Sequence, residues 1–165
     1  MRRPLEKIVL DRNRLLGIVE QERRSGKVIV FANGVFDILH VGHLRYLQAA
    51  AELGGALVVG VNDDDSVRLL KGEGRPILPC EDRLELVAGL ACVDWVTSFS
   101  GAKVSELLLL LKPDIHAKGT DYTAANVPEA DVVKSFGGRV EIVGDPKDHN
   151  TRDLLARIGR MRDRP

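Results

Sequence analysis

The chain has 165 residues, which is enough for one domain with a buried core. Its 24 basic and 24 acidic side chains cancel, so no overall charge draws it to nucleic acid or to an anionic membrane. Two cysteines argue against a disulfide framework and fit a reducing compartment. The N-terminus shows no signal-peptide pattern, and the longest leucine run, 107–111, is far too short to span a bilayer. We therefore expect a cytoplasmic protein with neither a nucleic-acid nor a membrane partner.

Helix and strand patterns alternate along most of the chain. Asp11 can cap a helix that runs to about Arg24, so residues 1–25 are interpreted as an N-terminal helical appendage that packs on the sheet or on a partner subunit. In chain order, the predicted elements that follow are a strand at 28–32, a helix at 41–51, a strand at 56–61, a helix at 63–70, a loop at 71–78, a helix at 79–90, a strand at 93–97, a helix at 104–111, a strand at 115–118, a helix at 129–136, a strand at 139–143 and a helix at 152–161.

The predicted strands are apolar on both faces and are separated by helices. This pattern is typical of a parallel sheet covered on both sides, because each crossover places a helix on one face. We therefore predict a single α/β domain, a Rossmann-like, doubly wound, five-stranded parallel sheet with helices on both faces. Ligands of such sheets bind beyond the carboxyl ends of the strands. The loops at 33–39, 62–63 and 119–122 should therefore converge on one crevice.

The motif H-V-G-H at 40–43 opens the predicted helix at 41–51, directly after a strand and a glycine-containing loop. A helix N-terminus offers unpaired backbone N–H groups and a partial positive charge. The two histidines share the first turn, and Gly42 between them has no side chain to obstruct a closely packed phosphate. This placement favours chemistry at a phosphorus atom over two alternatives. One is a pair of half-buried histidines bonded to local backbone, and the other is a zinc pair, for which Cys80 and Cys92 lack a suitable spacing.

Residues 33–43, NGVFDILHVGH, resemble the signature of the cytidylyltransferase-like nucleotidyltransferase superfamily. Further segments resemble the heptose 1-phosphate adenylyltransferases, and they lie at 59–64, 68–72, 74–77, 81–83 and 118–122. The resemblance extends over roughly residues 26–160, so residues 26–165 are expected to form a nucleotidyltransferase domain. Because no sugar-kinase domain precedes it, the chain resembles the stand-alone form of these enzymes rather than the fused kinase–adenylyltransferase.

The resemblance implies an adenylyltransferase that joins ATP and a heptose 1-phosphate to give ADP-heptose and pyrophosphate, for lipopolysaccharide or a related glycan precursor. The sugar-phosphate oxygen would attack the α-phosphorus of ATP directly and in line, because a substrate phosphate is already ionised. One alternative is a cytidylyltransferase acting on a polyol phosphate such as glycerol 3-phosphate. Another is a catalytically silent nucleotide-binding subunit, against which the retained His40, His43 and Lys71 argue.

The resemblance also implies a role for each candidate site residue. The catalytic residues are His40, His43 and Lys71, the last in a glycine-flanked loop that could close over the site. The nucleotide-binding residues are Asn33, Gly34, Val35, Phe36, His40, His43, Lys118, Gly119, Asp121, Asn150, Thr151 and Arg152. The sugar-phosphate-binding residues are Asp37, Asn62, Lys71, Arg83 and Tyr122. No protein metal ligand is expected, Mg²⁺ would be carried with ATP, and the active form is expected to be a homo-oligomer, a dimer.

Several of these residues also have a structural interpretation. Asp37 could organise its loop or be a solvated turn residue, and Arg83 could be a surface charge on its helix. Tyr122 could anchor its loop, and the asparagine and threonine at 150–151 are ordinary helix caps. His116 has no assigned partner and is interpreted as structural or exposed.

Two places depart from the pattern of the family that the chain resembles. Thr120 stands where a second glycine is usual, and residues 150–152, Asn-Thr-Arg, replace the usual Ser-Thr-Thr at the start of the last helix. A guanidinium at the positive end of a helix is locally unfavourable unless an anion binds there. Arg152 is therefore expected to contact the β- or γ-phosphate of ATP, the alternative being a surface pair with Asp148 or Asp153.

Overall fold

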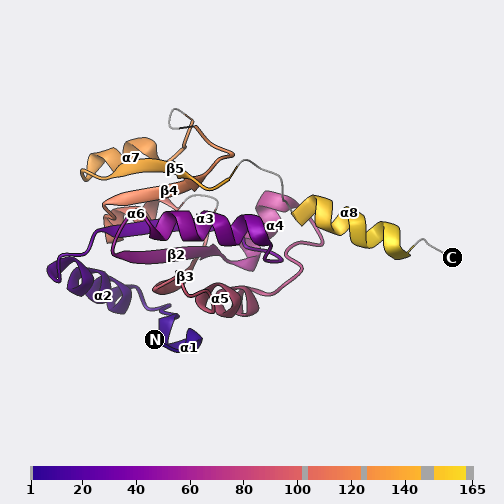
Figure 1. Ribbon diagram of the computed structural model, residues 1–165, viewed down its shortest axis with the longest axis horizontal. Helices are drawn as coiled ribbons and strands as arrows, with labels where there is room; N and C mark the ends of the chain where they lie inside the picture. The colour runs from indigo at the N-terminus through magenta and orange to yellow at the C-terminus, as the bar shows by residue number, and fades with distance from the viewer. Residues whose placement is uncertain (1, 102–103, 124–125, 146–150, 163–165) are drawn as a thin grey trace.

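The computed structural model describes residues 2–101, 104–123, 126–145 and 151–162, and for residues 151–154 and 162 it describes the backbone alone. Helices and strands alternate along the described chain (Figure 1). In chain order they are α1 (Pro4–Lys7), α2 (Arg12–Arg24), β1 (Ile29–Gly34), α3 (Val41–Ala51), β2 (Ala56–Asn62), α4 (Asp64–Lys71), α5 (Cys80–Ala88), β3 (Trp95–Phe99), α6 (Ser105–Leu111), β4 (Ile115–Gly119), α7 (Ala130–Ser135), β5 (Arg139–Val143) and α8 (Thr151–Arg162).

The strands form one sheet of five, in the order β3-β2-β1-β4-β5, and every neighbouring pair is parallel. β1, β2 and β4 are buried along most of their length, as expected of apolar strands covered on both faces. β2 and β3 lie on one side of β1, whereas β4 and β5 lie on the other. The strand order therefore reverses between β1 and β4, the point beyond which such sheets bind ligands. The predicted fold class is confirmed.

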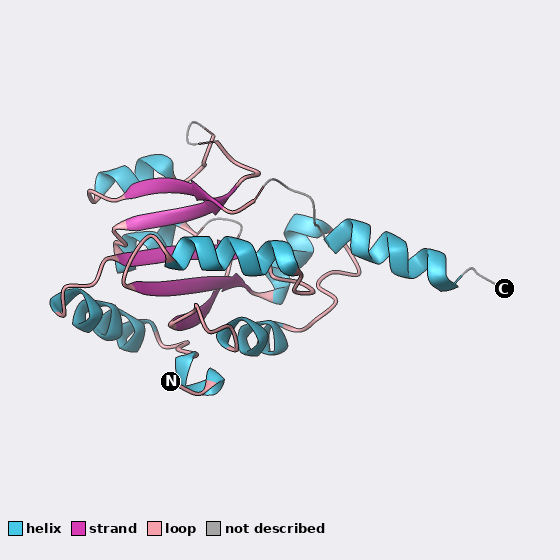
Figure 2. Ribbon diagram, viewed as in Figure 1, coloured by secondary structure: helices cyan, strands magenta, loops and turns pink. Residues whose placement is uncertain are grey.

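Helices cover both faces of the sheet, as Figures 1 and 2 show. On one face, α3 and α5 bury Leu47 and Val87 against strand residues such as Val59. On the other face, α2 and α6 bury Leu15 and Leu108, and α7 contributes to the same cluster. Full burial of one such side chain stabilises the fold by roughly 1.5–3 kcal/mol. Because packing holds the sheet from both sides, the loops at its carboxyl edge begin from fixed positions.

Several predicted boundaries shift by one or two residues, and two of these shifts change how a residue is interpreted. β3 lies further along the chain than the predicted strand at 93–97. Asp94 belongs to the segment before it, where its carboxylate accepts a hydrogen bond from Leu57 N at 2.9 Å. Lys71, predicted to lie in a loop, is instead the exposed last residue of α4. The chain leaves this helix at Gly72, whose φ of 91° suits a residue without a side chain.

The N-terminal segment packs against the sheet, which is one of the two arrangements considered for it. Val9 N donates a hydrogen bond to Val96 O of β3 at 2.8 Å. In α2, Glu22 accepts a hydrogen bond from Trp95 Nε1 at 3.2 Å, and Leu15 enters a hydrophobic cluster of the sheet. The short helix α1 was not among the predicted elements. Residues 2–25 thus cover one edge and part of one face of the sheet.

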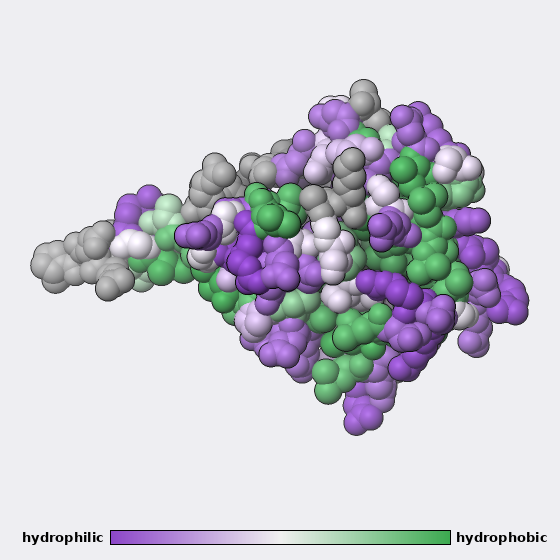
Figure 3. Space-filling view, turned by 180° about the vertical axis from the view of Figure 1, so that it is seen from behind, coloured by the Kyte–Doolittle hydropathy of each residue, from purple (hydrophilic) through white to green (hydrophobic). Residues whose placement is uncertain are grey.

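The C-terminal helix stands out from the body of the protein. α8 projects from one end of the molecule in Figure 1, and residues 156–161 within it are exposed. Seen from behind, exposed apolar side chains gather in separate patches among polar ones (Figure 3). None of the described helices is both long and apolar enough to cross a membrane.

Candidate active site

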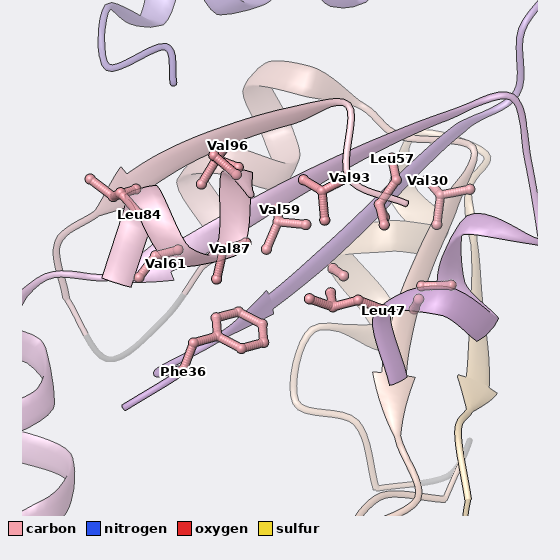
Figure 4. Close-up of a cluster of buried hydrophobic side chains, with 14 of the residues drawn as sticks. Val30, Phe36, Leu47, Leu57, Val59, Val61, Leu84, Val87, Val93 and Val96 are labelled. Atoms are coloured by element: carbon pink, nitrogen blue, oxygen red, sulfur yellow. The ribbon is translucent and has the colours of Figure 1, made fainter. Parts of the chain in front are cut away.

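The loop after β1 contains two non-glycine residues whose backbone conformations are rare for such residues. Phe36 and Ile38 have left-handed conformations, with φ of 51° and 64°. Non-glycine residues rarely occupy this region, and such strain concentrates at functional sites. The Phe36 ring is buried in the cluster under α3, where it is 2% exposed (Figure 4). Gly34 makes room for it, because a Cβ there would lie 3.0 Å from the ring. The loop ends at His40, which is the N-cap residue of α3.

His40 and His43 form a stacked pair at the start of α3. Their ring centroids lie 3.8 Å apart, with an angle of 23° between the planes. The Phe36 ring meets His43 edge-on, at a centroid distance of 5.3 Å. Hydrogen bonds to His40 O from His43 N at 3.0 Å and from Leu44 N at 3.2 Å close the first turn. The turn therefore fixes both imidazoles beside the carboxyl end of β1.

The pKa of His43 is lowered to about 4, chiefly by burial and then by the charge of His40, while Asp37 acts in the opposite direction. The ring is therefore neutral at neutral pH. Its Nδ1 is buried and has no hydrogen-bond partner among the described residues. Leaving a buried polar atom unpaired costs about 1–3 kcal/mol, so a ligand that bonded to it would be favoured. Among the described residues, local backbone does not satisfy this atom.

Two histidines make the stability of the protein depend on pH. Burial, aided by Lys118, lowers the pKa of His116 from 6.5 to about 3, as burial lowers that of His43 to about 4. As the pH falls below 6.5, the unfolded chain takes up protons that the folded chain does not, so the free energy of unfolding decreases. We expect urea titrations to show this loss between about pH 6.5 and pH 3, and the NMR signals of His43 to titrate near pH 4. In His40→Ala the pKa of His43 should rise. A wild-type His43 signal titrating near pH 6.5 would contradict this account.

Asp37 organises the loop that precedes α5. Its Oδ1 accepts hydrogen bonds from Ile77 N at 2.9 Å and Leu78 N at 3.0 Å, and its Oδ2 pairs with Arg75 Nη2 at 2.9 Å. The side chain is 1% exposed, so the interpretation as a solvated turn residue is wrong. These contacts support the role of loop organiser, whereas a substrate hydroxyl would have to compete with them.

Arg83 is fully buried, with a relative exposure of 0%. Its guanidinium donates hydrogen bonds to Val35 O at 2.6 Å, Asn62 O at 2.7 Å and Leu78 O at 3.0 Å. Its Nη2 also pairs with Asp64 Oδ1 at 2.6 Å. These acceptors belong to the loop after β1, the end of β2, the segment before α5 and the start of α4. The predicted surface charge is therefore wrong, and the predicted contact with the sugar phosphate gives way to a bracing role between these segments.

A second polar group lies at the end of β4, on the other side of β1. Lys118 pairs with Glu129 at 3.3 Å, and both side chains are buried. The Lys118 ammonium also lies 4.6 Å from the centre of the Tyr122 ring, a favourable cation–π distance. Glu129 was missed by sequence reasoning, because an acidic residue at a helix start is common for structural reasons.

Two side chains tie the neighbouring ends of β1 and β4 to each other and to α3. His116 is fully buried, and its Nε2 lies 3.0 Å from Asn33 Oδ1, so of its two interpretations the structural one holds. The Tyr46 hydroxyl of α3 donates to Ala117 O at 2.8 Å, and burial raises the pKa of Tyr46. The strands on either side of the reversal in strand order are therefore fixed relative to the histidine helix.

The other candidate residues lie at the same edge of the sheet or outside the described part. Asn62 ends β2 and is buried, and Gly119 ends β4, where a Cβ would meet nothing within 4 Å. Asp121 is exposed in the loop after β4. Asn150 lies outside the described residues, as do the side chains of residues 151–152 at the start of α8.

A doubly wound parallel sheet, with a half-buried histidine pair at the helix after its first strand, defines an α/β protein suited to phosphate groups. Residues 31–154 match the family model described as Cytidylyltransferase-like. The chain belongs to this family and is a nucleotidyltransferase. The superfamily expected from residues 33–43 is thereby confirmed.

Relatives match the chain over most of its length. It is 46% identical over 147 residues to the Bifunctional protein HldE of Syntrophotalea carbinolica, which covers 89% of this chain and 30% of that protein. It is 44% identical over 153 residues to the Bifunctional protein HldE of Pseudomonas aeruginosa, covering 93% and 32%. The chain thus spans about a third of the length of these curated relatives. The crystal structure of the lipopolysaccharide core biosynthesis protein from Thermoplasma volcanium GSS1 is 35% identical, with a TM-score of 0.60 over 72% of this chain and 95% of that one.

Proposed function

We propose that this chain transfers the adenylyl group of ATP to a heptose 1-phosphate, giving ADP-heptose and pyrophosphate for lipopolysaccharide or a related glycan. The observation that carries nucleotidyl transfer is the stacked pair of His40 and His43 at the N-terminus of α3. The heptose-type segments at 59–64 and 118–122 support the choice of sugar. Relatives named Bifunctional protein HldE and a lipopolysaccharide core biosynthesis protein support the same pathway.

The proposed reaction joins two polyanions, so the site must offset their repulsion and the charge that grows on the pentavalent phosphorus. His40 and His43 donate hydrogen bonds to oxygens of the α-phosphate, together with backbone N–H groups at the start of α3. The ionised oxygen of the sugar phosphate forms the new bond to the α-phosphorus. The bond from that phosphorus to the bridging oxygen breaks, and pyrophosphate leaves with the electron pair. Lys71, exposed at the end of α4, adds a positive charge as the following loop closes.

In-line displacement places the attacking and leaving oxygens on opposite sides of the α-phosphorus, and β1 separates two sets of loops that suit this geometry. Lys118 at the end of β4 and Asp121 in the loop after it lie on one side, and the segment between α4 and α5 lies on the other. We assign the nucleotide to the first side and the sugar phosphate to the second. Arg152, at the start of α8, would reach the β- or γ-phosphate.

We further propose that Mg²⁺ enters with ATP, where it would supply positive charge that offsets that of the phosphates, and that the enzyme works as a dimer in the cytoplasm. Within the described ranges, no three His, Cys, Asp or Glu side chains gather closely enough to hold a metal ion. Asp37 is already engaged by Arg75 and two backbone N–H groups. In this proposal the cation would be held chiefly by ATP itself, which suits an ion that keeps much of its water.

Pyrophosphate release should identify the substrates. Purified protein with ATP and a heptose 1-phosphate is expected to release pyrophosphate much faster than with CTP and glycerol 3-phosphate, because the segments around the site are of the heptose type. The His43→Ala variant, purified in the same way, controls for contaminating activity. Faster release with CTP and glycerol 3-phosphate would contradict the proposal and would indicate a polyol-phosphate cytidylyltransferase of the same family. Nucleotide binding without any turnover would indicate the silent subunit.

A further inference from the structure

Arg75 is a partly buried arginine with a donor that nothing in the described structure uses. Its side chain is 19% exposed, and its Nη2 lies 2.9 Å from Asp37 Oδ2. A guanidinium has five N–H donors in a planar fork, so this pair leaves much of it unused. The Nε of Arg75 is buried and has no hydrogen-bond partner among the described residues. A bound anion would satisfy that atom and remove the cost of leaving it unpaired.

The position of Arg75 connects it to the histidine pair. Asp37 precedes His40 in the loop after β1, and its charge acts on His43. The same carboxylate holds Arg75 on one side and the backbone N–H groups of the residues at 77–78 on the other. Asp37 therefore fixes the end of the α4–α5 segment beside the loop after β1 and sets the direction of the Arg75 guanidinium.

The opposite end of the same segment contains two glycines whose backbone conformations favour glycine. Gly72 and Gly74 have φ of 91° and 78°, and a Cβ at either position would meet nothing within 4 Å. Arg75 therefore lies between two glycines with open space around them and residues 77–78, whose backbone N–H groups are held by Asp37.

We propose that Arg75 binds the phosphate of the sugar phosphate and so determines specificity for a phosphorylated acceptor, with Asp37 as its positioning residue. This inference rests on the proposed function and names a contact within it. The segment lies on the β2 side of β1, opposite the loop assigned to the nucleotide, where in-line attack requires the acceptor. Guanidinium matches two phosphate oxygens at once, and its charge offsets that of Asp37, which would otherwise repel the substrate.

A purely structural role for Arg75 makes a different prediction. If it only neutralised Asp37, lysine would replace it well, because a point charge suffices for that task. If it holds a phosphate through two N–H groups, Arg75→Lys should keep the fold and recover only part of the affinity for the sugar phosphate. A variant Arg75→Lys that keeps its free energy of unfolding but loses affinity for the sugar phosphate would therefore indicate phosphate binding. A variant that keeps both would indicate a purely structural role.

The test is the initial rate of pyrophosphate release for the wild type, Arg75→Gln, Arg75→Lys and a control, Arg68→Gln. Arg68 is an exposed residue of α4 that pairs with Asp65 at the surface. In Arg75→Gln, KM for the sugar phosphate should rise about 10- to 100-fold, the scale of losing hydrogen bonds to a charged group. KM for ATP should stay within about twofold, and the control should match the wild type. An unchanged KM for the sugar phosphate, or an equal rise for ATP, would overturn the assignment.

A second measurement keeps this inference separate from the proposed function. If the wild type releases no pyrophosphate from ATP and heptose 1-phosphate, the proposed function fails, and calorimetric titration with inorganic phosphate then tests Arg75. The wild type and Arg68→Gln should bind inorganic phosphate more tightly than Arg75→Gln. Equal affinity in all three proteins, or no binding by the wild type, would refute a phosphate site at Arg75.

Discussion

Replacing His40 or His43 by alanine is expected to lower kcat by on the order of 10²–10³-fold, the scale of losing one transition-state hydrogen-bond donor. The His43 ring is neutral at neutral pH, and its buried Nδ1 has no partner among the described residues. The two rings are stacked at 3.8 Å, so removing one also removes support from the other. The double variant should therefore lose less than the product of the two single effects. Pyrophosphate release at saturating substrates measures all three.

Controls on the same helix separate chemistry from folding. Gln48 is exposed on α3, and Gln48→Ala should keep both kcat and the free energy of unfolding. The substitutions His43→Asn and His43→Gln place an amide N–H near the former Nδ1 or Nε2, so recovery in one of them identifies the donating nitrogen. Near-normal turnover in both alanine variants would refute the phosphate-donor role.

The fold was predictable because its determinants are local. Continuous apolar runs such as 56–61 predict buried strands, and glycines such as Gly26 follow the ends of helices. What the pattern could not give is the pairing of distant segments. The hydrogen bond from Val9 to Val96 and the strand order β3-β2-β1-β4-β5 depend on contacts between residues far apart in sequence. A local pattern records none of these contacts.

In the candidate site, too, the features that depend on local sequence could be predicted, and those that depend on contacts between distant residues could not. His40 and His43 form a contiguous motif, so their place at a helix N-terminus could be predicted. Their surroundings could not be, because Asp37 bonds to residues 40 and 41 positions away, and Arg83 reaches Val35 across 48 positions. Two acidic residues precede Arg83, a pattern typical of a solvated helix face. Only the tertiary structure shows that its charge lies inside the protein.

Arg83→Ala is expected to lower the free energy of unfolding by about 3–5 kcal/mol, the scale of breaking a buried charged pair by removing one partner. The substitution would leave the carbonyls of Val35, Asn62 and Leu78 without their donor, and Asp64 without its counter-ion. A cavity the size of the arginine side chain would add to the cost. Urea unfolding followed by circular dichroism measures the effect.

The matched control is Arg139→Ala, because Arg139 pairs with Glu141 on the surface, where the two side chains are 61% and 40% exposed. Surface pairs contribute about 0–1 kcal/mol, so this variant should unfold close to the wild type. Arg83→Lys should fall between the two, since an ammonium can hold Asp64 but cannot span three carbonyls from separate segments. Because those segments carry the candidate site, the Arg83 variants that remain folded should also show raised KM values. Unfolding of Arg83→Ala at the wild-type urea concentration would mean that water replaces the guanidinium, and that the loops are held by their own packing.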